Sequence, residues 1–169
     1  MDTLYTIMPS TLGDILIART KPGISHISFQ DGDSALSPQS DWIQDNTAFN
    51  DVINQLHAYF AGDLFEFDLP LAPEGTDFQQ DVWQKLQEIP YGETMTYGEI
   101  AQDLGNPKAS RAVGAANGRN PIPIVIPCHR VIGHNGKLTG FRGGLAFKEA
   151  LLGLERDGRL LMAWQLSLF

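Results

Sequence analysis

The middle of the chain reads YGEIAQDL at residues 97–104, GNP at residues 105–107 and KASRAVGAANG at residues 108–118. The spacing of Ile100, Ala101 and Leu104 predicts a short helix with one apolar face, and the Gly-Asn-Pro sequence predicts a turn before a second helix. Two short helices joined in this way are typical of a helix-turn-helix. An ordinary antiparallel helix pair has the same pattern, so the interpretation depends on the charge around it.

Charge is distributed very unevenly along the chain. Residues 105–148 contain seven basic and no acidic side chains, whereas residues 1–79 contain twelve acids against two bases and the whole chain has a net charge of −8. A basic block inside an acidic chain is typical of a surface that binds a polyanion. Because this block contains the second predicted helix, we interpret residues 97–118 as a DNA-binding helix-turn-helix.

The second predicted helix is rich in small residues, and Arg111 is its one long central side chain. A helix that reads base edges needs several long polar side chains. Small residues instead allow the backbone to approach phosphates closely, so we expect binding with little sequence preference. The candidate DNA contacts are Arg111, Ala109, Ser110, Ala112, Gly114 and Arg130.

The first 75 residues predict a separate small unit. Alternating apolar residues on both sides of residues 21–23 predict a β-hairpin, and helical spacing predicts a helix over residues 49–60. A surface loop is expected over residues 31–46, a strand over 65–69 and a linker over 70–75. Thr76 and Gln79 then form a capping-box pattern at the start of a further helix.

These patterns predict an α+β fold. A small N-terminal sheet-plus-helix domain (residues 1–70) precedes a mainly helical C-terminal domain with the helix-turn-helix (76–155) and a tail (156–169). The chain of 169 residues is 43% hydrophobic, which is enough for a sizeable core. Its longest apolar runs, of about five residues, exclude a membrane-spanning helix, and the N-terminus lacks a secretory signal. The single cysteine excludes an internal disulfide and favours the reducing cytoplasm.

That cysteine lies in NPIPIVIPCHRV, residues 120–131. Pro127 fits the first position of a helix, which would place Cys128 in the first turn. The helix dipole there, with His129 or Arg130 beside it, would stabilise a thiolate. A small core cysteine and a hydrogen-bonded core histidine are the structural alternatives. Because adjacent helical residues do not face each other, we expect a water molecule between Cys128 and His129 if they cooperate.

Pro127-Cys128-His129-Arg130-Val131 resembles the active-site motif of the O6-alkylguanine-DNA alkyltransferases. The resemblance extends through residues 111–114, 120–123 and 143–145 to Glu155 and covers residues 76–155 strongly. It implies a ribonuclease-H-like N-terminal domain and, from the length and the absence of zinc-binding cysteines, the bacterial constitutive type. It also implies direct reversal of O6-alkylguanine in double-stranded DNA, with O4-alkylthymine as a second candidate substrate, by a monomer without a metal or cofactor.

The resemblance further implies a role for each site residue. Cys128 would accept the alkyl group of a flipped nucleotide, once per molecule because a thioether has no ready leaving group. His129 would act as the base through water, and Glu155 would orient it. Tyr97 would donate a proton or hydrogen bond to guanine. Asn120 would hold the turn between the DNA-binding helices and the cysteine.

The same resemblance implies how the nucleotide is held. Arg111 would enter the base stack in place of the extruded nucleotide. Val131 and residues 138–144 would wall the base pocket. Within this loop Phe141 stands where the family often has Tyr, and Arg142, next to Gly143, stands where it often has a small residue. These two departures bear on the range of alkyl groups accepted rather than on the reaction.

The last five residues, QLSLF (165–169), resemble the pentapeptide with which bacterial polymerases and repair proteins bind the sliding clamp. Leu166, Leu168 and Phe169 would fill an apolar groove, and Gln165 would form a hydrogen bond at its edge. The alternative is a tail that packs on the protein's own core.

Two other functions fit the same residues. A lesion-binding or regulatory helix-turn-helix protein would bind DNA with an incidental cysteine. A thiol hydrolase would use Cys128 and His129 to turn over an ester or amide. Only the alkyltransferase is expected to acquire one alkyl group on Cys128 and then stop.

Overall fold

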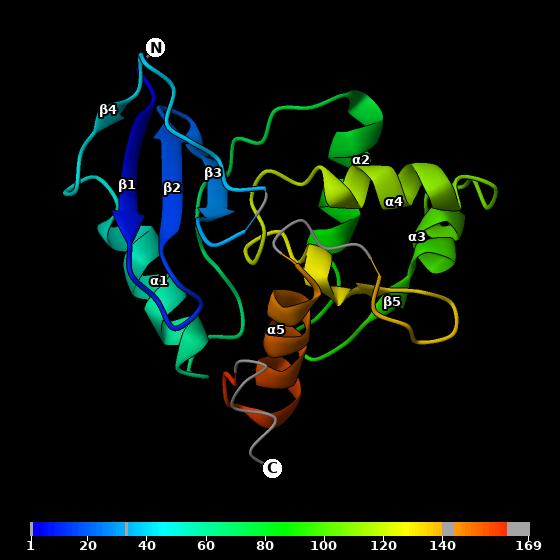
Figure 1. The fold of residues 1–169 in the computed structure, drawn as a ribbon. Coiled ribbons are helices and arrows are strands. Elements are labelled where there is room, and N and C mark those ends of the chain that lie inside the picture. The colour runs from blue at the N-terminus through cyan, green and yellow to red at the C-terminus, as the bar shows by residue number, and fades with distance from the viewer. Residues whose placement is uncertain (1, 33, 140–143, 162–169) are drawn as a thin grey trace.

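The computed structural model describes residues 2–32, 34–139 and 144–161, and it has two halves joined by an extended segment (Figure 1). The N-terminal half is a four-stranded sheet with the strand order β3-β2-β1-β4 and one helix, α1. The elements of this half are β1 (Leu4–Met8), β2 (Ile15–Thr20), β3 (Gly23–Phe29), β4 (Ile43–Gln44) and α1 (Asn50–Phe60).

The predicted hairpin is confirmed as β2 and β3, which pair antiparallel with Ile15 opposite Phe29 and Ile17 opposite Ile27. The interpretation of residues 31–46 as loop alone is wrong, because β4 lies within them and pairs parallel with β1.

The strand expected over residues 65–69 is absent from the structure, which has bends and irregular backbone there. The alternating aromatic residues have another cause. Phe65 packs against Tyr91, with ring centroids 4.8 Å apart, and Phe67 packs against Tyr59 at 5.3 Å. The chain here pairs with β3 only after this segment, where Leu71 forms an isolated bridge with Ile24.

The C-terminal half is mainly helical. Its elements are α2 (Asp77–Gln87), β5 (Met95–Thr96), α3 (Tyr97–Asp103), α4 (Ser110–Gly118), the 3₁₀ helix η1 (Cys128–Arg130), β6 (Val131–Ile132) and α5 (Leu145–Asp157). The Thr76–Gln79 capping box is confirmed at the start of α2. The predicted helix-turn-helix is α3 and α4, and Trp83 of α2 supports it by donating to the carbonyl of Ala116 at 2.8 Å.

The two halves are in direct contact. The backbone N–H of Ile27 in β3 donates to the carbonyl of Pro121 at 2.9 Å, and the ring of Phe29 stacks on Phe147 of α5 at 4.8 Å. In Figure 1, α5 lies at the lower centre, with the sheet and α1 on its left and α2, α3 and α4 on its right. No helix within the described residues is long and apolar enough to cross a membrane.

The sheet of the N-terminal half and the helices of the C-terminal half together form an α+β architecture, as expected.

Candidate active site

The loop between α4 and η1 places Cys128, and Asn120 closes that loop. The Asn120 side chain accepts from the N–H of Ile122 at 3.0 Å and donates to the carbonyl of Ile126 at 2.7 Å. Inside the loop, the backbone of Ile124 has a φ of 74°, which is rare and costly for a β-branched residue. The two side-chain hydrogen bonds hold this strained backbone in place.

Cys128 is buried at the start of η1, and Pro127 is the residue that caps it. This helix has three residues, so the expected α-helical dipole is missing. Burial raises the pKa of Cys128 to about 11, although a hydrogen bond from Asn120 and the positive charge of Lys148 act in the opposite direction. The expectation of a thiolate in the resting protein is therefore wrong, and the thiol needs a base before it can act as a nucleophile.

His129 has the geometry of that base. Its ring is fully buried, and its Nε2 atom lies 2.6 Å from Oε2 of Glu155. Since a carboxylate only accepts hydrogen bonds, Nε2 carries the proton and Nδ1 has the free lone pair. Nδ1 is buried and has no hydrogen-bond partner among the described residues. The imidazole can therefore accept a proton at Nδ1, and the Cys128 thiol is not in direct hydrogen-bond contact with it.

The Glu155 carboxylate accepts five hydrogen bonds from described residues. Its Oε2 receives Tyr59 at 2.6 Å, His129 at 2.6 Å and Arg130 at 3.1 Å, and its Oε1 receives Arg130 at 2.8 Å and the N–H of Gly92 at 3.0 Å. Burial alone would raise the pKa of this carboxyl group, but the hydrogen bonds from His129 and Arg130 and the charge of Arg130 hold it well below its usual range. Glu155 therefore carries a negative charge beside the imidazole.

The helix-turn-helix contains most of the predicted DNA contacts and Tyr97. Arg111 and Ala112 are exposed on α4, and the ring of Tyr97 lies next to Gly114, where an added Cβ would be 3.7 Å from it. The Tyr97 hydroxyl accepts from Oγ1 of Thr139 at 3.0 Å. The start of the predicted pocket loop thus meets the helix-turn-helix at Tyr97.

Two family models divide the chain between them. The model described as "6-O-methylguanine DNA methyltransferase, ribonuclease-like domain" matches residues 3–73, and the corresponding "DNA binding domain" matches residues 77–157. The chain belongs to the 6-O-methylguanine DNA methyltransferase family.

Relatives of this family match over most of the chain. The methylated-DNA–protein-cysteine methyltransferase of Methanosarcina acetivorans is 56% identical over 89% of this chain and 97% of its own length. The crystal structure of the Mycobacterium tuberculosis OGT in complex with DNA has a TM-score of 0.86 at 47% identity and covers 92% of this chain and 94% of its own. The similarity therefore includes both halves and the site between them.

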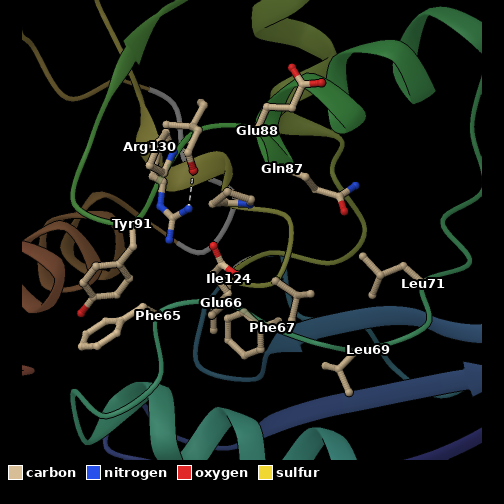
Figure 2. Close-up of a pocket in the computed structure, with 14 residues that line it drawn as sticks. Phe65, Glu66, Phe67, Leu69, Leu71, Gln87, Glu88, Tyr91, Ile124 and Arg130 are labelled. Carbon is tan, nitrogen blue, oxygen red and sulfur yellow. Dashed lines mark hydrogen bonds between the residues drawn. The ribbon is translucent and has the colours of Figure 1, made fainter.

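One predicted site residue of the methyltransferase chain is wrongly assigned. Arg130 was expected to contact DNA, but its side chain is buried and its guanidinium is bound to Glu155 and to the carbonyl of Ile89. Figure 2 shows it beside Tyr91, at the edge of a pocket of about 610 Å³ that Phe65 and Phe67 also line. Its charge neutralises a buried carboxylate and is not available to phosphates.

Sequence reasoning missed two residues that the structure places in or beside this buried cluster. Tyr59 was interpreted as part of the apolar face of α1, and Lys148 as one more base of the exposed block. Lys148 is fully buried and donates to the carbonyls of Val131 and Thr139, so it ties the buried Val131 to the start of the predicted pocket loop. Its position seven residues before Glu155, two helical turns away on one face of α5, is the signal that could have revealed it.

Several predicted residues lie outside the described parts of the chain. They are the pocket residues Phe141, Arg142 and Gly143 and the tail residues Gln165, Leu166, Leu168 and Phe169. Among the described residues, no group of three or more His, Cys, Asp or Glu side chains could hold a metal ion.

Acid is expected to destabilise this cluster. Burial lowers the pKa of His129, and the pKa of Glu155 is also held below its usual range. The unfolded chain therefore binds protons more readily than the native protein at both groups. Their contribution to stability is complete above the ordinary histidine value of 6.5. The His129 part declines as the pH falls from 6.5 through its lowered native pKa, and the Glu155 part begins to decline only near 4.5. We expect the urea midpoint to fall steadily from pH 7 to pH 4, and a constant midpoint would contradict this.

Proposed function

We propose that this protein repairs alkylated DNA directly, by transferring the alkyl group from O6 of a flipped guanine, or from O4 of thymine, to Cys128. The supporting observation is the arrangement around His129. A buried thiol precedes an imidazole whose Nδ1 is free and whose Nε2 is bound to an ionised Glu155. This arrangement supplies a base for a thiol that is protonated in the resting state.

The first step is proton removal from the thiol. The S–H proton of Cys128 passes through water to Nδ1 of His129, and the Glu155 charge stabilises the imidazolium that forms. The sulfur then attacks the alkyl carbon. The S–C bond forms while the C–O6 bond breaks, and the bonding electrons go to the guanine oxygen.

The leaving guanine must then gain the proton that the thiol lost. Tyr97 is the proposed donor, because its hydroxyl lies beside Thr139 at the start of the pocket loop. The Tyr97 phenolate then regains a proton from solvent while the imidazolium releases one to it, so the net change exchanges the thiol for a thioether and the lesion for guanine. Val131, together with Phe141, Arg142 and Gly143, is proposed to wall the pocket.

A thioether has no ready leaving group, so each molecule reacts once. With a tenfold excess of duplex DNA carrying O6-methylguanine, we expect the amount of repaired guanine to equal the amount of protein and then remain constant. Continued turnover would contradict the single-turnover reaction, and binding without repair would favour a non-catalytic lesion-binding protein.

Arg111 is proposed to occupy the gap in the base stack. Because flipping a paired base costs a few kcal/mol, we expect Arg111→Ala to slow transfer from duplex DNA at least about tenfold and transfer from single-stranded DNA much less. Lys108→Ala is the matched control, since it removes a nearby exposed charge. This change should weaken binding to both substrates similarly and reduce the salt dependence. Equal loss on both substrates with Arg111→Ala would contradict the role in flipping.

We also propose that Gln165–Phe169 bind a bacterial sliding clamp, on the support of the sequence motif alone. A pulldown with purified clamp should recover the full chain and not a chain that ends at Trp164. Equal recovery of both would contradict this. We further propose that the protein is a monomer in the cytoplasm. Its domains would comprise residues 1–70 and 76–155, followed by a tail at residues 156–169.

A further inference from the structure

The buried cluster contains a hydroxyl that the proposed reaction does not use. Tyr59 comes from α1, in the N-terminal half, and its side chain is fully buried. Its hydroxyl donates to Oε2 of Glu155 at 2.6 Å and lies 3.4 Å from Nε2 of His129. The N-terminal half therefore reaches the carboxylate that activates the base.

The Tyr59 ring is fixed on several sides. Phe60, Phe67 and Tyr91 pack around it, with ring centroids between 5.3 and 6.1 Å away. Burial and the neighbouring Glu155 charge raise the pKa of the Tyr59 phenol well above its usual value, so it remains a hydrogen-bond donor. A rigid, permanently protonated donor can hold the carboxylate in one orientation.

Oε2 is shared between Tyr59 and His129. A carboxylate oxygen that already accepts a short hydrogen bond has less negative charge available for a second donor. Tyr59 therefore fixes the direction of Oε2 and also limits how strongly Glu155 favours the charged imidazole. Such a limit is useful, because His129 must be neutral before it can accept the thiol proton.

We propose that Tyr59 is a positioning residue for alkyl transfer, which holds Oε2 of Glu155 against His129 and keeps the resting imidazole neutral. This inference rests on the proposed function. It implies that the N-terminal half contributes to the chemistry through one hydroxyl, in addition to covering the catalytic half.

The test is the pH dependence of the single-turnover transfer rate in Tyr59→Phe. Without the hydroxyl, Glu155 acts on His129 more strongly, so the pKa of His129 rises. We expect the acid limb of the profile to move up by about one pH unit. At pH values low enough to lie on the acid limb of both proteins, the transfer rate should then fall about tenfold relative to the original protein. Affinity for DNA should not change. A nitrogen NMR titration of the His129 ring should show the same shift without DNA.

Two control variants separate positioning from packing. Tyr5→Phe removes a phenolic hydroxyl from β1, and Phe67→Leu disturbs the packing around the Tyr59 ring while leaving its hydroxyl. Both should retain the original pH profile, even if Phe67→Leu lowers the melting temperature. Ring-fluorinated tyrosine at position 59 is a stronger donor and should move the acid limb in the opposite direction.

The outcomes are distinct. An unchanged profile and an unchanged His129 titration in Tyr59→Phe would overturn the inference, as would the same shift in Phe67→Leu. Should Tyr59→Phe fail to fold, the protein with fluorinated tyrosine at position 59 provides the test. A pH profile that does not move in that protein would also overturn the inference. A failure of the proposed function is recognised separately, since the original protein would then transfer no alkyl group.

Discussion

Cys128→Ala is expected to abolish alkyl transfer completely while DNA binding is retained. Cys128 supplies the only thiol of the chain, and a thiol is the group that gives a stable thioether on alkylation. Transfer should fall below detection, rather than by a finite factor, since no second group can form the thioether. The substitution removes one buried atom, so the loss of stability should be only about 1 kcal/mol.

Binding provides the internal control for this variant. The exposed groups of α4 are not altered, so the dissociation constant for lesion-containing duplex DNA should remain within about twofold at a fixed salt concentration. Transfer is measured by loss of the lesion from DNA at a large excess of protein. Any residual repair by Cys128→Ala would refute Cys128 as the acceptor, whatever the binding result.

Arg130→Met is expected to cause the largest loss of stability of any single change at the site. The variant leaves the buried Glu155 carboxylate without its charged partner, which typically costs about 3–5 kcal/mol. Three hydrogen bonds are lost at once, two to Glu155 and one to the carbonyl of Ile89. Urea denaturation at pH 7 measures this cost.

Two further variants show whether the loss of stability in Arg130→Met comes from the uncompensated charge of Glu155. Arg156→Met removes a guanidinium that is exposed and bound to the adjacent Asp157, so the urea midpoint should hardly change. The double variant Arg130→Met with Glu155→Gln removes both charges and should recover part of the loss, because the uncompensated charge is gone. A small loss in Arg130→Met alone, or additive losses in the double variant, would contradict this explanation.

The sequence predicted the elements whose signals are local. The β2–β3 hairpin, the Thr76 capping box and the two helices of the helix-turn-helix all follow from short-range patterns, and all are present. The strand expected at residues 65–69 failed because period-two alternation of apolar residues does not by itself require a strand. Phe67 packs on Tyr59, the largely exposed Phe65 packs on Tyr91, and this part of the chain pairs with β3 only at Leu71.

The buried charges were not predictable from composition. The basic block favoured a DNA-binding surface, but Arg130 and Lys148 lie in the interior, where they satisfy Glu155 and the carbonyls of the pocket. Tyr59 and Glu155 are separated by 96 residues, so no local pattern connects them. The sequence pointed to Cys128 as the candidate alkyl acceptor, but the protonation of its thiol depends on burial, which only the fold reveals.

The most direct test of the account is peptide mass analysis of the protein after one reaction with O6-methylguanine DNA. The peptide containing Cys128 is expected to gain the mass of one methyl group, in proportion to the guanine repaired, and no other peptide is expected to change. Repair of guanine with an unmodified Cys128 peptide, or a methyl group on any other residue, would contradict it.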